Sequence, residues 1–389
     1  MMTFPSRLPA VGTTIFTVMS ALAAKHGAVN LGQGFPDFDC DPTLIHAVHE
    51  AMQQGHNQYA PMTGIAPLRK AIADKTAMLY GHHYDADTDI TVTAGATQAL
   101  LTVVLCCVHP GDEVIIIEPA YDSYRPAIAL AGGVAIPVAM RVAVNPASGQ
   151  LRYHLHIEDI ARAITPRTRL IMLNTPHNPT GTTLQANDLQ ALSDLLVNTD
   201  ILLCADEVYE HMVFDDARHE SVARYPQLAE RSFVVSSFGK TFHVTGWKIG
   251  YVAAPAALSL EFRKVHQFNV FAVNTPMQLG LAHYLRDPAS YQRLSAFYQA
   301  KRDRFIAGLN TTRFQFTPSA GTYFQCVDYR AISTLPEAEF CEWLTTEIGV
   351  AAIPPSAFYG TPIESGMIRF CFAKKDSTLD AAIARLQRI

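Results

Sequence analysis

The sequence predicts an α/β protein built on a mostly parallel sheet. Short apolar runs alternate with longer helical patterns through the middle of the chain. Each run is unbroken rather than alternating, as expected of strands buried on both faces of a sheet. Strands of this kind with helices between them indicate a parallel sheet covered by helices.

The expected strands of this sheet span residues 90–93, 114–117, 170–173, 201–205 and 233–235. After about residue 285 the chain becomes helix-rich, and it continues through 313–328, a helix near 337–347 and a final strand at 367–372. Two domains are expected, because single cores stop growing near roughly 250–300 residues. The large domain is predicted to span residues 46–285. The N-terminal arm, 1–45, and residues 286–389 are predicted to form a smaller α+β domain.

Composition narrows the class of protein. Hydrophobic residues make up 49% and charged residues 17%, which excludes a disordered chain. The net charge of −5 gives no basic stripe, so we expect a small-molecule ligand and no nucleic acid. Seven scattered cysteines without a C-x-x-C pair indicate a reducing compartment. No signal peptide or membrane span is evident, so a soluble cytoplasmic protein is expected.

Glycine, polar and aromatic residues follow all five expected strands. They are Gly95, Ala96 and Thr97 after the first strand, Tyr121 after the second, Asn178 after the third, Asp206 and Tyr209 after the fourth, and Lys240 after the fifth. Ligands of such sheets bind at the carboxyl ends of the strands. We therefore expect these residues to meet at one edge of the sheet.

Lys240 is the most reactive candidate among them. A lysine amine held out of water can form a Schiff base with an aldehyde, which is how pyridoxal phosphate is carried. A single lysine at a turn more often extends into solvent, so this interpretation depends on its neighbours. The cofactor also needs an anion for its ring nitrogen, donors for its phenolic oxygen and a site for its phosphate.

Each of these needs has a candidate. Asp206 would pair with a protonated ring nitrogen, although a helix N-cap or an internal salt bridge would also explain it. Tyr209 and Asn178 could donate to the phenolic oxygen, or be a core tyrosine and a turn residue. Tyr121 could stack on the ring, or simply pack in the core.

A phosphate site is predicted where residues 95–97 lead from a strand into a helix, because helix N-termini attract anions. Ser237 and Lys248 could add a hydroxyl and a charge, although Lys248 could equally be an ordinary surface lysine. Arg369 is a charge inside an apolar strand, and a substrate carboxylate would satisfy its guanidinium. An internal Asp or Glu would do so equally well.

Three runs in the chain resemble those of the class I pyridoxal-phosphate aminotransferases, of fold type I. These runs are Asn-Thr-Pro-His-Asn-Pro-Thr-Gly at 174–181, Asp-Glu-Val-Tyr at 206–209 and Ser-Ser-Phe-Gly-Lys-Thr-Phe-His-Val-Thr-Gly-Trp-Lys-Ile-Gly-Tyr at 236–251. The resemblance extends over nearly the whole chain, including residues 30–37 and 58–64. Within the class, the chain is most similar to the methionine, kynurenine and glutamine K aminotransferase group.

The resemblance implies a role for each candidate. Lys240 would carry the cofactor and move protons, while Asp206, Asn178 and Tyr209 would bind its ring nitrogen and phenolic oxygen. The residues implied for the phosphate are Gly95, Ala96, Thr97, Ser237, Lys248 and, from the second subunit of a homodimer, Tyr59. Tyr121 would stack on the ring, and the substrate carboxylate would meet Arg369, Asn178 and the backbone of Gly34. Some members of the family carry arginine at the position of Lys248. A lysine there keeps the positive charge but lacks the paired N–H donors of a guanidinium.

The resemblance also implies the substrate class. Dicarboxylate-specific relatives carry an arginine in the segment that corresponds to residues 267–271, where this chain has no cation. With Phe16, Tyr59 and Tyr121 expected near the substrate, the pocket suits methionine first, and also phenylalanine, tyrosine, leucine, glutamine or kynurenine. The expected reaction is a ping-pong transfer of the amino group to a 2-oxo acid.

Other functions remain open at this point. A C–S β-lyase acting on cysteine conjugates or cystathionine would share the fold and Lys240. A regulator that senses the cofactor would carry a DNA-binding domain, and only about thirty residues precede Asn30. A metal site is not expected, since His46 and His49 lack further ligands nearby and fit a solvated helix face.

Overall fold

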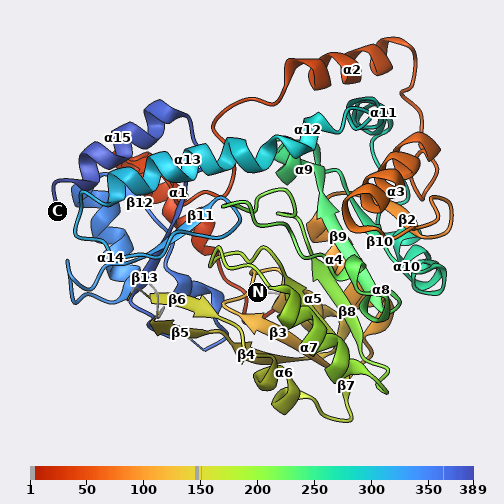
Figure 1. Cartoon of the computed structure of the whole chain (residues 1–389), viewed down its shortest axis with the longest axis horizontal. Coiled ribbons are helices and arrows are strands. Elements are labelled where there is room, and N and C mark those ends of the chain that lie inside the picture. The colour runs from red at the N-terminus through yellow and green to blue at the C-terminus, as the bar shows by residue number, and fades with distance from the viewer. Residues whose placement is uncertain (1–4, 145–148, 150, 362) are drawn as a thin grey trace.

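The computed structural model of the chain describes residues 5–144, 149, 151–361 and 363–389. Its central sheet has seven strands in the spatial order β2-β10-β9-β8-β7-β3-β4 (Figure 1). These strands are β2 (Ile90–Thr93), β3 (Glu113–Glu118), β4 (Val134–Ala139), β7 (Thr168–Asn174), β8 (Leu202–Asp206), β9 (Ser232–Ser237) and β10 (Gly250–Ala253). Only β10 runs antiparallel to its neighbours in the sheet. The expected α/β class with a mostly parallel sheet is confirmed.

Both faces of this sheet are buried, as the unbroken apolar runs predict. In β3, Ile115 and Ile117 join one buried cluster, whereas Val114 and Ile116 join the other. Alternate side chains of a strand point to opposite faces, so a strand covered on both sides must be apolar throughout. The helices nearest these faces are α3 (Ala66–Tyr80), α6 (Ile157–Ala163) and α7 (Ala186–Leu196) on the first cluster, and α4 (Ala96–Cys107), α5 (Tyr124–Ala131) and α10 (Ala256–Asn269) on the second.

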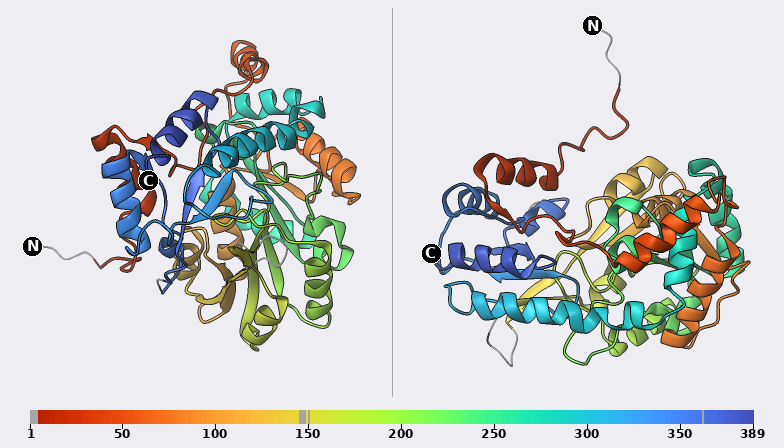
Figure 2. Two further views of the ribbon diagram at one scale, coloured as in Figure 1. Left: turned by 60° about the vertical axis from the view of Figure 1, so that its left-hand side comes forward. Right: turned by 90° about the horizontal axis from the view of Figure 1, so that it is seen from above.

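The two ends of the chain come together in a smaller part of the molecule. Strand β1 (Val29–Asn30) pairs in parallel with β12 (Val350–Ala351), and β11 (Phe324–Asp328) pairs antiparallel with β13 (Met367–Cys371). The helices of this part are α1 (Ile15–His26), α13 (Leu294–Leu309), α14 (Glu337–Trp343) and α15 (Asp376–Leu386) (Figures 1 and 2). The domain division itself stays a prediction. Its boundary at residue 46 falls within α2 (Pro42–Gln53), which packs on α11 (Thr275–Tyr284).

The remaining elements are short. They are β5 (Arg141–Val144), β6 (Leu151–His154), α8 (Pro226–Ala229), α9 (Phe238–Thr241), α12 (Ala289–Gln292), the 3-10 turns Val222–Arg224, Thr245–Trp247 and Pro355–Phe358, and the π turn Leu344–Ile348. Strands β5 and β6 form a separate antiparallel hairpin. No helix in the described part of the chain is long and apolar enough to cross a membrane.

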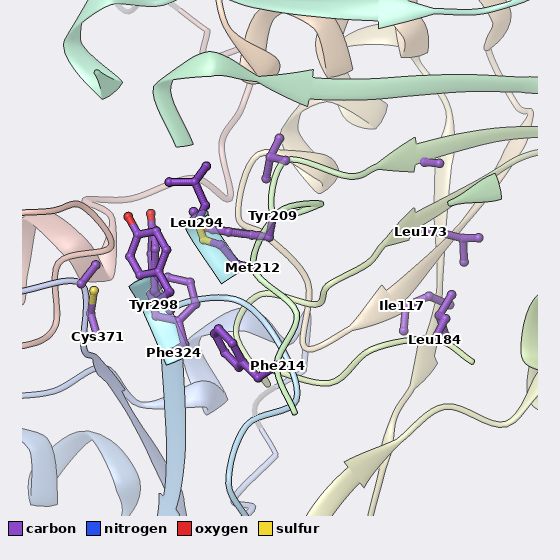
Figure 3. Close-up of a cluster of buried hydrophobic side chains, with 14 of the residues drawn as sticks. Ile117, Leu173, Leu184, Tyr209, Met212, Phe214, Leu294, Tyr298, Phe324 and Cys371 are labelled. Carbon is purple, nitrogen blue, oxygen red and sulfur yellow. The ribbon is translucent and has the colours of Figure 1, made fainter. Parts of the chain in front are cut away.

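One buried cluster joins the large sheet to the smaller part of the molecule. Tyr209 and Met212, which follow β8, lie in the same cluster as Tyr298, Phe324 and Cys371 (Figure 3). This packing holds the carboxyl ends of β7, β8 and β9 against β11 and β13. The predicted site residues from both halves of the sequence can therefore meet at this junction.

Candidate active site

A cavity of about 180 Å³ lies at the carboxyl ends of the parallel strands. Ten of the predicted site residues line it: Gly95, Ala96, Thr97, Tyr121, Asn178, Asp206, Tyr209, Ser237, Lys240 and Lys248. Nine of them lie at or after the ends of β2, β3, β7, β8 and β9, which are neighbours in the sheet apart from the interposed β10, and Lys248 lies just before β10. The expected meeting of five strand ends at one edge is confirmed.

The start of α4 forms one wall of this cavity. Gly95 has a φ of +79°, in the left-handed region, and lets the chain turn from β2 directly into the helix. Gly250 allows β10 to pass close by, since a Cβ there would lie 3.1 Å from the backbone nitrogen of Ala96. The first backbone N–H groups of α4 therefore face the cavity without an intrahelical partner.

Hydroxyl groups and one ammonium group surround this helix start. Thr97 and Ser237 line the cavity beside Lys248. A Cβ on Gly95 would lie 3.3 Å from Nζ of Lys248, so only glycine leaves the space in front of that ammonium group open. Backbone N–H groups, hydroxyls and a cation around such a space suit a phosphate group.

Asp206 ends β8 and its carboxylate is buried in the cavity wall. Oδ2 accepts a hydrogen bond from Tyr124 at 2.7 Å, and Oδ1 accepts one from the backbone of Val208 at 3.3 Å. Among the described residues no cation forms an ion pair with it. Burial raises the pKa of Asp206 from 3.8 to about 6, against the lowering effect of these hydrogen bonds. A cationic ring nitrogen would supply the missing partner.

Lys240 lies one turn after β9 and is half-buried. Its Nζ donates to the hydroxyl of Tyr323 at 3.1 Å and to the carbonyl of Gly34 at 3.2 Å. Tyr323 in turn donates to the same carbonyl at 2.5 Å. Burial lowers the pKa of Lys240 from 10.5 to about 8, so roughly a tenth of the amine is unprotonated at pH 7. The amine is thus a competent nucleophile.

Arg369 is fully buried on β13, yet among the described residues it forms no ion pair with a carboxylate. It donates to Oδ1 of Asn178 at 2.8 Å and to the carbonyl of Gly32 at 2.9 Å, and its Nε has no partner. Its guanidinium lies 3.9 Å from the ring centre of Phe324 and 5.4 Å from that of Phe16. A buried cation with only neutral partners suits an incoming carboxylate.

The two tyrosines predicted at the cofactor ring differ in burial. Tyr209 is buried, and burial raises the pKa of its hydroxyl, which therefore remains a donor. Tyr121 is partly exposed, and its hydroxyl lies 3.3 Å from that of Thr97. Its side chain lines the cavity next to the start of α4.

Four predicted residues do not line this cavity. Arg369 and Gly34 adjoin it through hydrogen bonds with Asn178 and Lys240, whereas Tyr59 and Phe16 lie apart from it. Tyr59 is 82% exposed, its ring packs against Phe271, and it does not line the cavity of its own chain. Phe16 packs against Phe358, with ring centres 5.7 Å apart, and reaches the site only through the guanidinium of Arg369.

Three residues with direct roles in this geometry were not predicted: Tyr124, Tyr323 and Asn174. Oδ1 of Asn174 accepts from the backbone of Asn178 at 2.6 Å, and its Nδ2 donates to the carbonyl of Asp206 at 2.8 Å. Its place at the end of β7 was a usable signal, because polar residues at such ends mark ligand sites. Nothing local marks Tyr124 or Tyr323, whose partners are more than eighty residues away in the chain.

These observations fit pyridoxal phosphate at each of its functional groups. The unpaired carboxylate of Asp206, the open space at Gly95 and the amine of Lys240 match its ring nitrogen, phosphate and aldehyde. The guanidinium of Arg369, which forms no ion pair with a carboxylate in the described part of the chain, remains for a substrate carboxylate.

Comparison with known proteins agrees with this geometry. Residues 26–386 match the family "Aminotransferase class I and II". The chain is 52% identical to the methionine aminotransferase of Escherichia coli over 99% of this chain and 98% of the relative. It is 33% identical to kynurenine–oxoglutarate transaminase 1 of Rattus norvegicus, over 98% and 97% of the two chains. A probable N-succinyldiaminopimelate aminotransferase of Mycobacterium tuberculosis is 43% identical over 98% and 97%.

Solved structures show the same architecture. An Escherichia coli protein described as having a methionine aminotransferase function superposes with a TM-score of 0.96 at 51% identity, over the full length of both chains. An aspartate aminotransferase of Thermus thermophilus superposes with a TM-score of 0.89 at 30% identity, also over both full lengths. The predicted fold type I architecture is confirmed. The chain therefore belongs to the class I and II aminotransferases, enzymes that use pyridoxal phosphate.

Proposed function

We propose that this enzyme moves the amino group of a neutral apolar or aromatic L-amino acid, methionine first, to a 2-oxo acid. The observation that carries the proposal is that the Lys240 amine and the Arg369 guanidinium lie at the same junction, beside aromatic rings. Among the described residues, this guanidinium has no carboxylate partner. Methionine and kynurenine are the substrates named for two of its relatives, and they are neutral.

Each residue has a proposed task at this junction. When bound, pyridoxal phosphate takes up the amino group and stabilises negative charge at the substrate Cα. Arg369 and Asn178, with the backbone at Gly34, hold the α-carboxylate and thereby direct the Cα–H bond toward Lys240. Nζ of Lys240 then takes the proton from Cα and returns it during the transfer. Asp206 keeps the ring nitrogen protonated, while Tyr209 donates to the phenolic oxygen.

The walls around Arg369 favour a neutral substrate side chain. Phe16, Phe324 and Phe358 lie 3.9–5.5 Å from its guanidinium, measured to their ring centres. A second substrate carboxylate would need a cation, and residues 267–271 supply none. Because one relative acts on N-succinyldiaminopimelate, that compound belongs in the substrate panel.

The proposed enzyme is a homodimer that shares its active sites and acts in the cytoplasm. Tyr59, Phe268 and Phe271 are 82%, 91% and 51% exposed, which is unusual for neighbouring aromatic side chains on a free surface. Residues 5–14, which precede α1, extend outward from the molecule (Figure 2). A second copy would cover these surfaces, and Tyr59 would then reach the phosphate of its partner's site.

The decisive experiment follows the visible absorbance of the bound cofactor as single amino acids are added without a 2-oxo acid. The panel compares methionine, phenylalanine, tyrosine, leucine, glutamine and kynurenine with aspartate and N-succinyldiaminopimelate. We expect methionine to change the absorbance fastest. Faster conversion of aspartate than of methionine or phenylalanine would show that the apolar-pocket hypothesis is wrong. Pyruvate and ammonia released from cysteine conjugates without an acceptor would identify a β-lyase.

A mixing experiment tests the shared site. Lys240→Ala and Tyr59→Ala variants, each weakly active alone, are combined and allowed to exchange subunits. Every mixed dimer contains one site with an intact Lys240 and an intact Tyr59. Activity should therefore rise above the sum of the two separate samples, whereas no rise would show that Tyr59 serves its own chain or none.

A further inference from the structure

The segment that follows β8 divides between the cavity and a separate buried cluster. Asp206 and Tyr209 line the cavity. Glu207 lies between these two residues in the chain, and Glu210 follows Tyr209. Both glutamates are buried and form hydrogen bonds with residues that do not line the cavity. The proposed reaction assigns no task to this second pair of carboxylates, although burying two charges is costly unless each has partners.

Glu210 is the centre of the cluster. Its Oε1 accepts from Nζ of Lys75 at 2.6 Å, from Oγ of Ser236 at 2.7 Å and from the hydroxyl of Tyr251 at 3.1 Å. Its Oε2 accepts from the hydroxyl of Tyr80. Glu210 and Lys75 are both buried, so the ion pair is shielded from solvent and from salt. We call these five residues the Glu210 cluster.

The Glu210 cluster joins four elements at the back of the cavity wall. Lys75 and Tyr80 lie on α3, Ser236 on β9 and Tyr251 on β10. Glu210 itself directly follows Tyr209, and Ser236 directly precedes Ser237, two residues that line the cavity. The Glu210 carboxylate therefore connects the two segments of backbone that carry Tyr209, the proposed donor to the phenolic oxygen, and Ser237, the proposed hydroxyl at the phosphate.

The Glu210 carboxyl keeps its charge at neutral pH. Burial alone would raise the pKa of the Glu210 carboxyl, but the charge of Lys75 and the hydrogen bonds from Lys75 and Tyr80 hold it well below its ordinary value. His211 lies 3.3 Å from Nζ of Lys75, and burial lowers its pKa to about 3, so it stays neutral. The cluster is thus a buried ion pair of Glu210 and Lys75 surrounded by hydroxyl donors.

We propose that Glu210 is a positioning residue, which holds Tyr209 and Ser237 in place against the cofactor through the buried bonds of the Glu210 cluster. This inference rests on the proposed cofactor role of the cavity. A buried carboxylate with four donors restricts the side-chain rotation of each partner. The backbone of the adjacent residues Tyr209 and Ser237 is then also less mobile. Loss of the carboxylate should loosen the phenolic and phosphate contacts together.

The test compares Glu210→Gln with the charge-balanced double variant Lys75→Met/Glu210→Gln and with Ser236→Ala, which leaves the ion pair intact. The matched control is Glu113→Gln. Glu113 is equally buried, accepts from Thr165 at 2.5 Å, and lies at the opposite end of the sheet, at the start of β3. The measurements are the dissociation constant of pyridoxal phosphate, the pH midpoint of its visible absorbance, and the thermal midpoint of the apoprotein.

Glu210→Gln should weaken cofactor binding by roughly tenfold or more, as expected for a lost charged hydrogen bond, and should shift the pH midpoint. The double variant should recover thermal stability relative to the single variant without recovering that pH midpoint. Ser236→Ala should fold and shift the midpoint in the same direction by less. Glu113→Gln should lower only the thermal midpoint.

Unchanged cofactor affinity and pH midpoint in Ser236→Ala and in the double variant would overturn the proposal, and would leave Glu210 as a purely structural residue. Failure of Glu210→Gln to fold does not prevent this decision, because the other two variants still report it. A wild-type protein that binds no cofactor would instead reject the proposed function, before any variant is compared.

Discussion

The hydroxyl of Tyr124 donates a hydrogen bond of 2.7 Å to Oδ2 of Asp206. It is the only side-chain donor to this buried carboxylate among the described residues, and it does not neutralise the charge. Burial therefore keeps the pKa of Asp206 raised, at about 6. In the apoprotein the Asp206 anion is therefore incompletely stabilised until a cationic ring nitrogen binds. The charge of Asp206 favours cofactor binding but lowers the folding stability of the apoprotein.

Asp206→Asn should stabilise the apoprotein at pH 7.5 while nearly abolishing transamination. The folded carboxyl titrates at about 6 and its ordinary value is 3.8, so the folded state binds more protons between these values. The free energy of unfolding therefore falls as pH rises through this window, by up to about 3 kcal/mol. An asparagine carries no charge, so the variant does not suffer this loss. Thermal unfolding of the apoprotein at pH 4 and 7.5 measures the difference.

The gain from Asp206→Asn should be present at pH 7.5 and absent near pH 4, where the carboxyl is protonated. Asp74→Asn is the matched control, since Asp74 is exposed and pairs only with Lys70. An equal gain at both pH values would mean that the charge of Asp206 is not the source of the effect.

The amine of Lys240 should react with added cofactor in a pH-dependent way. Burial lowers the pKa of Lys240 to about 8, so the rate at which pyridoxal phosphate attaches to the apoprotein should rise with pH up to a midpoint near 8. An unshielded lysine would give a midpoint above 10. Stopped-flow absorbance between pH 6 and 9.5 measures this rate.

Lys240→Ala should lose at least ~10²-fold of its activity, because the variant lacks both the nucleophile and the proton-transfer group. Borohydride reduction followed by mass spectrometry should find the cofactor on the peptide that contains Lys240 in the wild type, and on no peptide of the variant. Attachment to another lysine would contradict the assignment.

Arg369→Lys should weaken all amino acid substrates to the same degree. The guanidinium would lose its paired donors to the α-carboxylate, which every substrate carries, and kcat/KM should fall by roughly 10- to 100-fold. The ratio of kcat/KM for methionine to that for phenylalanine should stay constant. A changed ratio would place Arg369 at the substrate side chain instead.

Lys248→Met should weaken pyridoxal phosphate by roughly tenfold through the loss of one charged contact. Lys248→Arg should bind at least as well as the wild type, because the charge is kept and a fork is added. Pyridoxal without its phosphate is the matched control, and its affinity should be the same for all three proteins. Equilibrium dialysis gives these constants, and an equal loss for pyridoxal would exclude a phosphate contact.

Local patterns in the chain were enough to predict the fold class and most of the residues that line the cavity. Unbroken apolar runs predicted the buried parallel strands, because hydrophobic periodicity is a local property of the chain. The same strands predicted that Gly95, Asn178, Asp206 and Lys240 would meet, since parallel strands end at one edge. Strands β4 and β10 of the sheet were not predicted, because Pro137 interrupts the first and Gly250 begins the second, and both residue types are uncommon inside strands.

The partners of these residues depend on how distant segments of the chain pack together. Tyr124 and Asp206 are 82 residues apart in the chain, Lys240 and Tyr323 are 83 apart, and Asn178 and Arg369 are 191 apart. Whether Arg369 meets an internal carboxylate or stays open for a substrate depends on which side chains pack beside β13. Such contacts arise when distant segments pack together, and no local pattern in the sequence encodes them. The identity of the reactive residues can thus be predicted from the sequence. Their pKa values, and which of their polar atoms lack a partner, depend on tertiary packing.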